Sequence, residues 1–443
     1  MPRSQHQQLN PLLNAGFYLL LVILFAIFSA AFEMVSFIRV LRPILVFSIL
    51  GLLIVFITGQ FVKVINTPIG MCILAFTVWF IACIPFGEWP GGSFRVFTDY
   101  WYKAALVFAM TAGLLTTLPQ AKRLLHLIGF GIGVAAVIAL LKRQTQYGRL
   151  GLFGTRYENA NEFAWTLLVG VVLLGYMYLR GTRIQKAAAL VLVVPVLLAL
   201  AKTGSREGML GILVLLAIAF FHVSTAGKVK MLLACTVMFA VILVVLPTDI
   251  RMRYTTWFGE ISYYGPISME KRTIGSTLGR LTLLKDSIRV TLMHPLLGVG
   301  PGNFPVAQDK LAKARGERSL WHVTHNSYTE VSSEMGIPGL AIYLTLLYQI
   351  FKQLRAILRT KQRGPAWEEL RMMALALQSI MICFLVIASF ASLGFNTDVP
   401  ILAGVTVALG FIVQRQRAID RMTAQEAVVE PSAEAGLETV AVG

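Results

Sequence analysis

The chain has 443 residues, of which 56% are hydrophobic and 14% are charged, and its mean hydropathy is +0.71. Because soluble domains carry roughly 25% charged residues, this composition excludes an ordinary soluble protein and predicts a polytopic membrane protein. The net charge of +17 would suggest nucleic acid binding in a soluble chain, but here membrane topology and lipid headgroups explain it better, and we expect no nucleic acid partner.

Taken in chain order, the apolar runs predict about twelve membrane-spanning helices, so the expected fold class is all-α. The expected spans lie near residues 15–32, 44–58, 68–84, 103–118, 124–141, 161–179, 187–202, 208–222, 230–247, 337–352, 372–393 and 398–413. This divides the chain into helices one to nine at 1–247, a polar loop domain at 248–336, helices ten to twelve at 337–413 and a tail at 414–443. The first span shows no small-residue cleavage site after a short apolar core, so we expect no cleavable signal peptide.

The basic residues predict which side of the membrane each connection faces. An even number of spans puts both termini on one side, and the connections on that side hold 18 Lys and Arg residues, against 10 in the short connections opposite. Cytoplasmic connections carry the excess of Lys and Arg. We therefore expect both termini in the cytoplasm of a bacterial inner membrane protein, and an exported, periplasmic loop of short helices at 248–336. From Met422 the tail has no Lys or Arg, and we expect it to be disordered.

The four cysteines give no sign of a disulfide framework or a metal site. All of them lie inside apolar runs, without a CxxC spacing: Cys72, Cys83, Cys235 and Cys383. Free cysteines in such runs behave as small apolar side chains. The sequence therefore predicts neither disulfides nor bound metal.

The long polar connection ends in a motif that reads HNSYTEVSSEMGIPGL over residues 325–340 and runs directly into an apolar span. A histidine there can move a proton near neutral pH at the membrane surface. The alternative is a polar helix start, in which Asn326 or Thr324 caps the helix and Glu330 lies in its first turn. From spacing alone the helix start is the commoner arrangement.

Several arginines lie in connections expected on the exported side, against the general distribution of charge. Residues 141–161 read LKRQTQYGRLGLFGTRYENAN, the turn at 202–208 reads KTGSREG, and residues 280–304 read RLTLLKDSIRVTLMHPLLGVGPGNF. The planar fork of arginine binds phosphate oxygens in pairs, so this pattern predicts a polyanionic ligand. The alternative, contact with phosphates of membrane lipids, is weakest for Arg156, Arg206 and Arg280, which each lie close to a glycine.

Three glycines follow the helix break expected at Pro295. Gly298, Gly300 and Gly302 permit a tight turn close to a ligand or to another backbone. They do not form a dinucleotide-binding fingerprint, because the third glycine is misplaced and no βαβ unit surrounds them.

Together the local patterns resemble one family. They read GRLG at 148–151 with NANEFA at 159–164, TGSREG at 203–208, HPLLGVGPGNF at 294–304, and HNSY at 325–328 with EMGIPG at 334–339. In this order, with the histidine motif at the end of a long exported loop, they resemble the O-antigen ligase and polymerase superfamily of bacterial envelope glycosyltransferases. The resemblance covers roughly residues 100–410.

The resemblance implies a glycan donor carried on undecaprenyl pyrophosphate and a periplasmic reaction that forms a glycosidic bond. In the ligase branch the acceptor is the lipid A–core oligosaccharide, and in the polymerase branch it is another lipid-linked repeat unit. We favour the ligase branch, because one long exported loop directly precedes the histidine motif. A branch that glycosylates proteins often has an additional C-terminal domain, which this sequence does not suggest.

This chemistry needs a base for the acceptor hydroxyl and cations for the departing pyrophosphate. We expect His325 to be the base and Arg206 and Arg280 to bind the pyrophosphate, with Arg149, Arg156 and Arg289 as secondary candidates. Asp398 is expected either to orient a cation or His325, or to cap the last span. Further candidates to support the site are Asn326, Glu330 and Glu334, although the two glutamates more often would face solvent or a neighbouring helix. No Asp-x-Asp pair stands in the exported loops, so we expect no cofactor and no metal.

Two other classes of function remain open at this stage. A transporter of lipid-linked sugars would also suit many spans and exported arginines, but transporters more often show paired halves and charged or broken helices near the midplane. A purely structural scaffold offers no reason for arginines to gather near a histidine.

Overall fold

A computed structural model describes residues 10–35, 37, 43–146, 148–233, 236, 248–255 and 269–438. Nearly all of this described part is helical. One antiparallel pair of two-residue strands, β1 (Thr145–Gln146) and β2 (Arg149–Leu150), interrupts the helices. The expectation of an all-α fold is therefore confirmed.

The helices follow one another along the chain with short connections between most of them. Their bounds are α1 Pro11–Ser29, α2 Ala31–Met34, α4 Pro43–Ile57, α5 Gln60–Ile65, α6 Pro68–Cys83, α7 Pro90–Val96, the π-helix η1 Phe97–Trp101, α8 Tyr102–Leu114, α9 Leu118–Lys142, α10 Ala160–Arg180, α11 Arg183–Lys202, α12 Arg206–His222, α14 Thr248–Thr255, α15 Met269–Met293, α16 Phe304–Ala314, α17 Ser327–Leu358, α18 Pro365–Ile387 and α19 Asp398–Glu438.

Seven of the described helices are long and apolar enough to cross a membrane: α1, α9, α10, α11, α17, α18 and the Asp398–Thr423 part of α19. The sequence had predicted about twelve spans. Helices form at eleven of those places, but four of them have only 13 to 17 residues: α4, α6, α8 and α12. α4 and α6, with 15 and 16 residues, are shorter than the roughly 17 to 25 residues usual for a span, and α12 is at the lower limit. α8 continues directly from α7 and η1, so the helical stretch there runs from Pro90 to Leu114. The expected span at 230–247 lies mostly outside the described residues.

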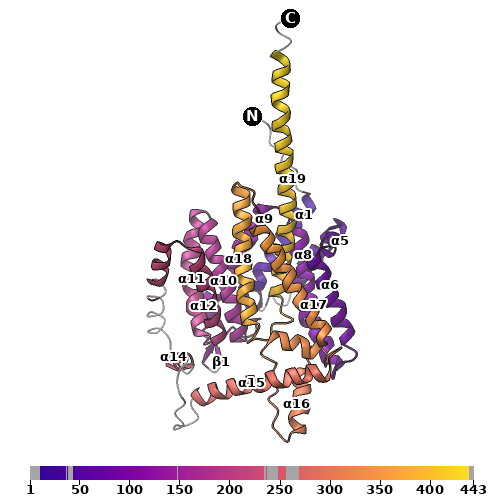
Figure 1. The fold of residues 1–443 in the computed structure, drawn as a ribbon. Helices are drawn as coiled ribbons and strands as arrows, with labels where there is room; N and C mark the ends of the chain where they lie inside the picture. Colours follow the sequence, from indigo (N-terminus) through magenta and orange to yellow (C-terminus); the bar gives the residue numbers. More distant parts are fainter. Residues whose placement is uncertain are drawn as a thin grey trace.

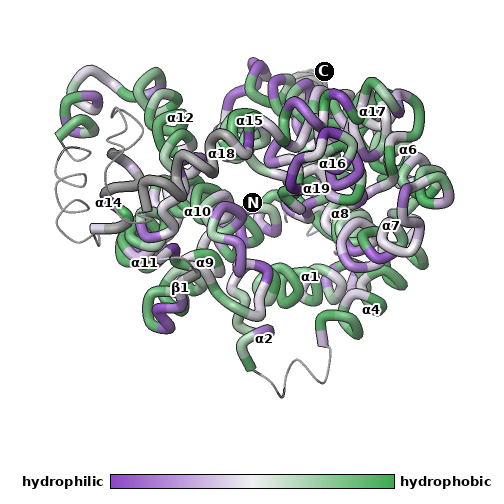
Figure 2. The backbone as a smooth tube through the Cα atoms, turned by 90° about the horizontal axis from the view of Figure 1, so that it is seen from below, coloured by the Kyte–Doolittle hydropathy of each residue, from purple (hydrophilic) through white to green (hydrophobic). Residues whose placement is uncertain are grey.

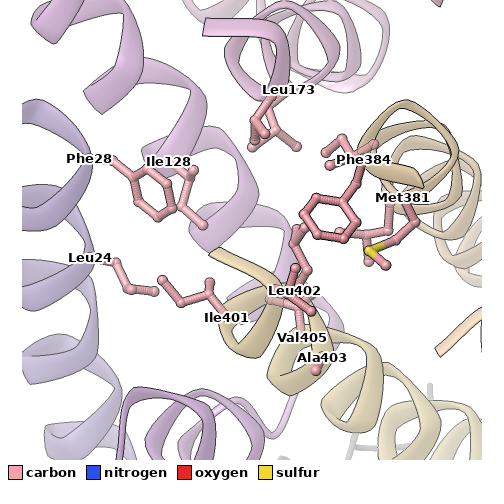
Figure 3. Packing of buried hydrophobic residues seen from close by; sticks show 14 of the residues in the cluster. Leu24, Phe28, Ile128, Leu173, Met381, Phe384, Ile401, Leu402, Ala403 and Val405 are labelled. Atoms are coloured by element: carbon pink, nitrogen blue, oxygen red, sulfur yellow. The ribbon is translucent and has the colours of Figure 1, made fainter. Parts of the chain in front are cut away.

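The long helices run alongside one another and share one hydrophobic core (Figure 1). Figure 3 shows part of it, where Phe28 of α1 lies beside Ile128 of α9, and Phe384 of α18 lies near Leu402 of α19. These side chains are almost completely buried. α1, α9 and α18 therefore meet near the start of α19.

Two helices lie at one end of this bundle. α15 runs across the bundle rather than along it, with α16 beside it, whereas both marked ends of the chain lie at the opposite end (Figure 1). Seen from the α15 end, rim helices such as α1, α4 and α6 are mostly hydrophobic, and hydrophilic stretches gather on α16 and the connections around it (Figure 2). α15 has 25 residues, so the region expected to contain only short helices includes one long one.

α17 contains a sharp break. Gly336 has φ 71° and ψ −177°, which is not a helical conformation, so a short buried helix ends there and a longer apolar one begins. A side chain at Gly336 would be strained, and its Cβ would meet the carbonyl oxygen of Leu296 at 2.0 Å. The break lets the polar residues that begin α17 and the apolar residues that follow point in different directions.

The end of the chain differs from the expectation of an irregular tail at 414–443. α19 continues as one helix from the bundle to Glu438 and projects beyond it (Figure 1). The physical reason is local, because Ala, Glu, Gln, Met and Arg dominate the first part of the tail and all favour helix. The expectation of disorder rested on glutamates and small residues without Lys or Arg from Met422 onward, and this composition does not exclude a helix.

Candidate active site

One cavity of about 1930 Å³ lies where α2, α4, α8, α10, α12, α15 and α17 approach one another. Its lining includes five of the predicted site residues that carry a positive charge or a proton-accepting ring: Arg149, Arg156, Arg206, Arg280 and His325. They come from four separate parts of the chain. The fold therefore brings together residues that the sequence analysis linked only through chemistry.

His325 immediately precedes α17 and has a left-handed backbone, with φ 54°. Its N–H donates to the hydroxyl of Ser392 at 2.9 Å, and Thr324 contacts the same hydroxyl at 3.1 Å. Ser327 donates to the carbonyl of Ala391 at 2.7 Å. The histidine motif is thus fixed to the connection between α18 and α19, which holds the imidazole at the cavity.

The surroundings of His325 favour the neutral imidazole. Burial lowers its pKa to about 4, and the positive charges of Arg280, His322 and Arg149 act in the same direction. The sequence analysis had assumed an ordinary histidine pKa of about 6.5. The structure corrects this, because desolvation and neighbouring cations both penalise the imidazolium.

Asn326 serves as the cap of α17. Its side-chain oxygen accepts from the N–H groups of Tyr328 and Thr329, both at 3.0 Å, and its amide nitrogen donates to the carbonyl of Ser389 at 3.1 Å. The capping alternative therefore holds for Asn326, while its neighbour His325 lines the cavity. Capping is therefore confirmed for Asn326, and proton transfer by His325 stays a prediction.

Arg156 is held by Asp398, the first residue of α19. Its guanidinium donates to one carboxylate oxygen at 2.6 Å, and the indole N–H of Trp165 donates to the other oxygen at 2.9 Å. The Asp398 carboxylate is almost completely buried. Of the roles expected for Asp398, contact with a cation is the one seen in the structure, and the cation is Arg156.

Arg280 of α15 forms a 2.7 Å ion pair with Glu207, which is buried in the first turn of α12. The Glu207 carboxylate also interacts electrostatically with Arg149 and Arg206. Arg149 in turn donates to the carbonyl of Thr203 at 2.8 Å and to the side chain of Asn161. One buried carboxylate therefore gathers three arginines that arrive from β2, α12 and α15.

Arg289 differs from the other predicted arginines. It lies on α15 like Arg280, but it is exposed and is not among the residues that line the cavity. Nine positions separate the two residues, which places them about 180° apart around a helix. The expectation that Arg289 helps to bind pyrophosphate at this site is not supported by its position.

Glu330 and Glu334 are buried and accept hydrogen bonds from backbone N–H groups. Glu330 accepts from Gly394 at 2.8 Å, and Glu334 accepts from Gly302 at 2.6 Å. Both line the cavity. The two side chains therefore do not face solvent. Glu330 joins α17 to the α18–α19 connection, and Glu334 joins it to the glycine-containing turn.

The turn with the three glycines packs directly against the start of α17. Val299 donates to the carbonyl of Ser333, and Gly300 donates to that of Glu334, both at 2.9 Å. Gly298, Gly300 and Gly302 have φ between 67° and 91°, and a Cβ on Gly298 would lie 2.3 Å from the carbonyl carbon of Glu334. The close approach is to another backbone, which is one of the two roles expected for these glycines.

Comparison with known proteins gives one match. Residues 188–344 match a protein family model described as O-antigen ligase, Wzy_C. The chain contains an O-antigen ligase family domain. No curated protein matches the chain.

The family domain includes most of the site. Arg206, Glu207, Arg280, the glycine-containing turn and His325 all fall within residues 188–344. Arg149, Arg156 and Asp398 lie outside the matched residues but contact the same cavity or its wall. The family domain and the flanking membrane helices therefore build the site together.

Some residues of the site were missed by sequence reasoning. Glu207 and Ser392 were not selected, nor were His322, whose ring lies 6.2 Å from that of His325, and Glu33, which accepts from the backbone N–H of Arg156 at 3.0 Å. Glu207 stood in the TGSREG motif, directly after Arg206, and could have been considered as a counter-ion. The others gain their positions only through tertiary contacts.

The cavity is not strongly positive, in spite of its arginines. Five basic and six acidic side chains line it: Lys103, Arg149, Arg156, Arg206 and Arg280, and Glu33, Asp99, Glu158, Glu162, Glu330 and Glu334. Among the described residues, no group of three or more His, Cys, Asp and Glu side chains is placed to hold a metal ion. Metal independence of the reaction stays a prediction.

Proposed function

We propose that this protein is an O-antigen ligase. It transfers a polysaccharide from undecaprenyl pyrophosphate to the lipid A–core oligosaccharide, at the periplasmic face of the bacterial inner membrane. The family domain supports a glycan-transferring membrane protein in polysaccharide assembly. The observation that carries the proposal is the presence of four arginines and a histidine of lowered pKa in the lining of one cavity.

In the proposed reaction, a hydroxyl oxygen of the acceptor attacks the anomeric carbon of the donor glycan. The bond between that carbon and the pyrophosphate oxygen breaks, and undecaprenyl pyrophosphate leaves with the electron pair. His325 takes the proton of the attacking hydroxyl, for which it must be neutral. Histidine with a depressed pKa is a weaker base but is fully available at periplasmic pH.

Arginines supply the stabilisation of the leaving group in this scheme. Arg206 and Arg280 bind the pyrophosphate oxygens, and Arg149 and Arg156 contribute from the β2–α10 side of the cavity. Preorganised donors of this kind commonly contribute about 10²–10³-fold each to the rate. Glu207 and Asp398 act as positioning residues, because they hold Arg280 and Arg156 before the donor arrives.

The lipopolysaccharide of a deletion strain tests the proposal. We expect core without any attached O-antigen, restored by the parent gene and not by His325→Gln. Core that carries a single repeat unit would contradict the ligase assignment and indicate a polymerase. Movement of labelled lipid-linked sugar across vesicles without bond formation would instead indicate a transporter.

Arg280→Lys tests the role of the arginine fork. Lysine keeps the charge but cannot bind two oxygens in one plane, so we expect transfer to fall at least about tenfold. Arg318→Lys, at an exposed arginine outside the cavity lining, is the matched control and should keep the parent rate. Equal rates in both variants would mean that Arg280 contributes only its positive charge and not its planar fork.

A further inference from the structure

α15 has three distinct faces. One face packs on α16 and α17 through Leu283, Val290 and Thr291, whose hydroxyl contacts that of Ser332 at 2.8 Å. The face that carries Arg280 borders the cavity. The third face is exposed, and it is the one that the proposed function does not use.

The exposed face is apolar along its centre and basic along one edge. Leu281, Ile288 and Leu292 lie within about 40° of one another around the helix axis, and they are 49%, 47% and 72% exposed. Lys285 and Arg289 follow on one side of this strip and are also exposed. The only acid nearby on the helix, Asp286, is buried and forms a paired contact with Arg315 at 2.8 and 3.1 Å.

The depth of this face relative to the membrane helices follows from backbone contacts. The carbonyl of Pro295, directly after α15, accepts from the N–H of Ile337 at 2.8 Å. Ile337 follows the break at Gly336 and begins the apolar part of α17. The C-terminal end of α15 therefore lies at the level where a membrane span starts.

The orientation of the helix agrees with this depth. α15 runs across the bundle rather than along it (Figure 1). Helices that lie in the plane of a membrane interface combine this direction with an apolar strip and Lys or Arg at its edge. Leu296, directly after α15, is also exposed, at 70%, and Trp89, whose carbonyl accepts from the Asn303 side chain of the glycine-containing turn, is 53% exposed.

We propose that the exposed face of α15 lies on the bilayer surface. Leu281, Ile288 and Leu292 insert between acyl chains, while Lys285 and Arg289 bind the phosphates of anionic phospholipids. This gives Arg289 a different ligand from Arg280, although both are arginines of the same helix. The same helix thereby fixes the height of the cavity wall relative to the headgroups, independently of the reaction that the cavity catalyses.

Lipid quenching in nanodiscs tests the insertion. A bimane is attached at Leu292→Cys in full-length protein whose four native cysteines are replaced by alanine, with Ala314→Cys on α16 as the control position. Phosphatidylcholine brominated on its acyl chains should quench the label at 292 and not the one at 314, whereas aqueous iodide should do the reverse. Quenching by iodide alone at 292, or by neither reagent, would overturn the proposal, the second result indicating a protein partner or a second copy.

The headgroup contact is tested with the lipid composition. When brominated phosphatidylglycerol is added to the nanodiscs with brominated phosphatidylcholine, quenching of the label at position 292 should rise roughly twofold or more. The reason is that each surface cation attracts anionic lipid. Lys285→Gln with Arg289→Gln should abolish this increase, while the matched pair Lys313→Gln with Arg318→Gln should retain it. An unchanged increase in the Lys285 and Arg289 variant would contradict their assignment. Every variant should elute at the same volume as the parent protein, which confirms that its fold is intact.

Discussion

The proton affinity of His325 is set by its neighbours rather than by its type. Burial, and electrostatic interactions with Arg280, His322 and Arg149, lower the pKa to about 4. The two arginines are distant in the sequence, so the sequence alone predicted an ordinary value. A base of this kind is available over a wider range of pH, at the expense of a smaller driving force for proton transfer.

The pH dependence of transfer follows with a definite sign. The active form is neutral, and it is present above the pKa, so the rate should stay nearly constant from pH 7 to about pH 5 and fall near pH 4. Folding stability should also decline as the pH falls from about 6.5 towards 4, because the unfolded histidine binds the proton more readily. Transfer rates measured at each pH check the first effect. Recovery of the rate on return to pH 7 checks the second.

The control for this profile is His222→Gln, at the exposed C-terminal end of α12, which should keep the parent profile. His325→Gln should be inactive at every pH. A fall in the parent rate centred near pH 6.5 would mean that some other group, or an unperturbed imidazole, controls the reaction.

Asp398→Asn separates the positioning of Arg156 from the packing of α19. The amide can still accept the indole N–H of Trp165 but no longer neutralises the guanidinium, so we expect reduced transfer and a loss of stability of up to about 3 kcal/mol. Asp420→Asn is the matched control, because Asp420 also accepts an indole N–H, from Trp367 at 2.8 Å, at the far part of α19. Transfer assays and thermal unfolding in detergent measure the two effects. Parent-like transfer in Asp398→Asn would remove Arg156 from the proposed donor site.

At the scale of elements, the glycine-containing turn and the start of α17 form one unit. The sequence predicted that the turn would approach a ligand or a backbone, and it could not say which. The deciding contacts join Val299 and Gly300 to Ser333 and Glu334, and these partners are distant in the chain. Local conformation was predictable here, and the tertiary partner was not.

Gly298→Ala should disrupt this unit. Its φ of 67° strains any other residue, and the new Cβ would clash with the backbone of Glu334, so we expect a loss of about 2–4 kcal/mol. Gly316→Ala is the matched control, because Gly316 has φ 69° but nothing within 4 Å of its Cβ position. It should lose only about 1 kcal/mol through strain. Thermal unfolding of both variants makes the comparison, and equal losses would show that the turn can move away from α17.

The arginines of α15 show what helical periodicity can and cannot predict. The spacing of Arg280 and Arg289 places them on different faces of the helix, but periodicity does not say which face borders the cavity. That depends on how Leu283 and Val290 pack against α16 and α17. The sequence analysis ranked Arg280 above Arg289 as a site residue, and the structure places only Arg280 in the cavity lining.

At the scale of the whole molecule, the sequence predicted most helices and their order, because apolar runs and their breaks are local features. It did not predict the ion pairs of Arg156 with Asp398 and of Arg280 with Glu207, which join distant parts of the chain. The site could thus be predicted as a set of residue types but not as a network of contacts.

The proposed topology is tested by labelling from outside the cell. The end of the bundle with α15 and α16 lies opposite the end from which α19 projects (Figure 1), and the basic residues predict cytoplasmic termini. An impermeant thiol reagent should label Lys313→Cys on α16, and not Lys361→Cys between α17 and α18, in spheroplasts of a strain whose protein lacks native cysteines. Both positions should react after lysis, and the reverse pattern in intact spheroplasts would invert the orientation.

The balance of acidic and basic side chains around the cavity has a consequence for how the donor is captured. The lining contains five Lys or Arg and six Asp or Glu side chains, so its formal charges give no large positive excess to attract a pyrophosphate over distance. Capture should depend on diffusion within the bilayer and on direct contact with the arginines, both of which salt screens weakly. Raising sodium chloride from about 50 mM to about 500 mM, which shortens the screening length severalfold, should therefore change KM for the donor by less than about threefold, whereas a steep rise would reveal long-range attraction.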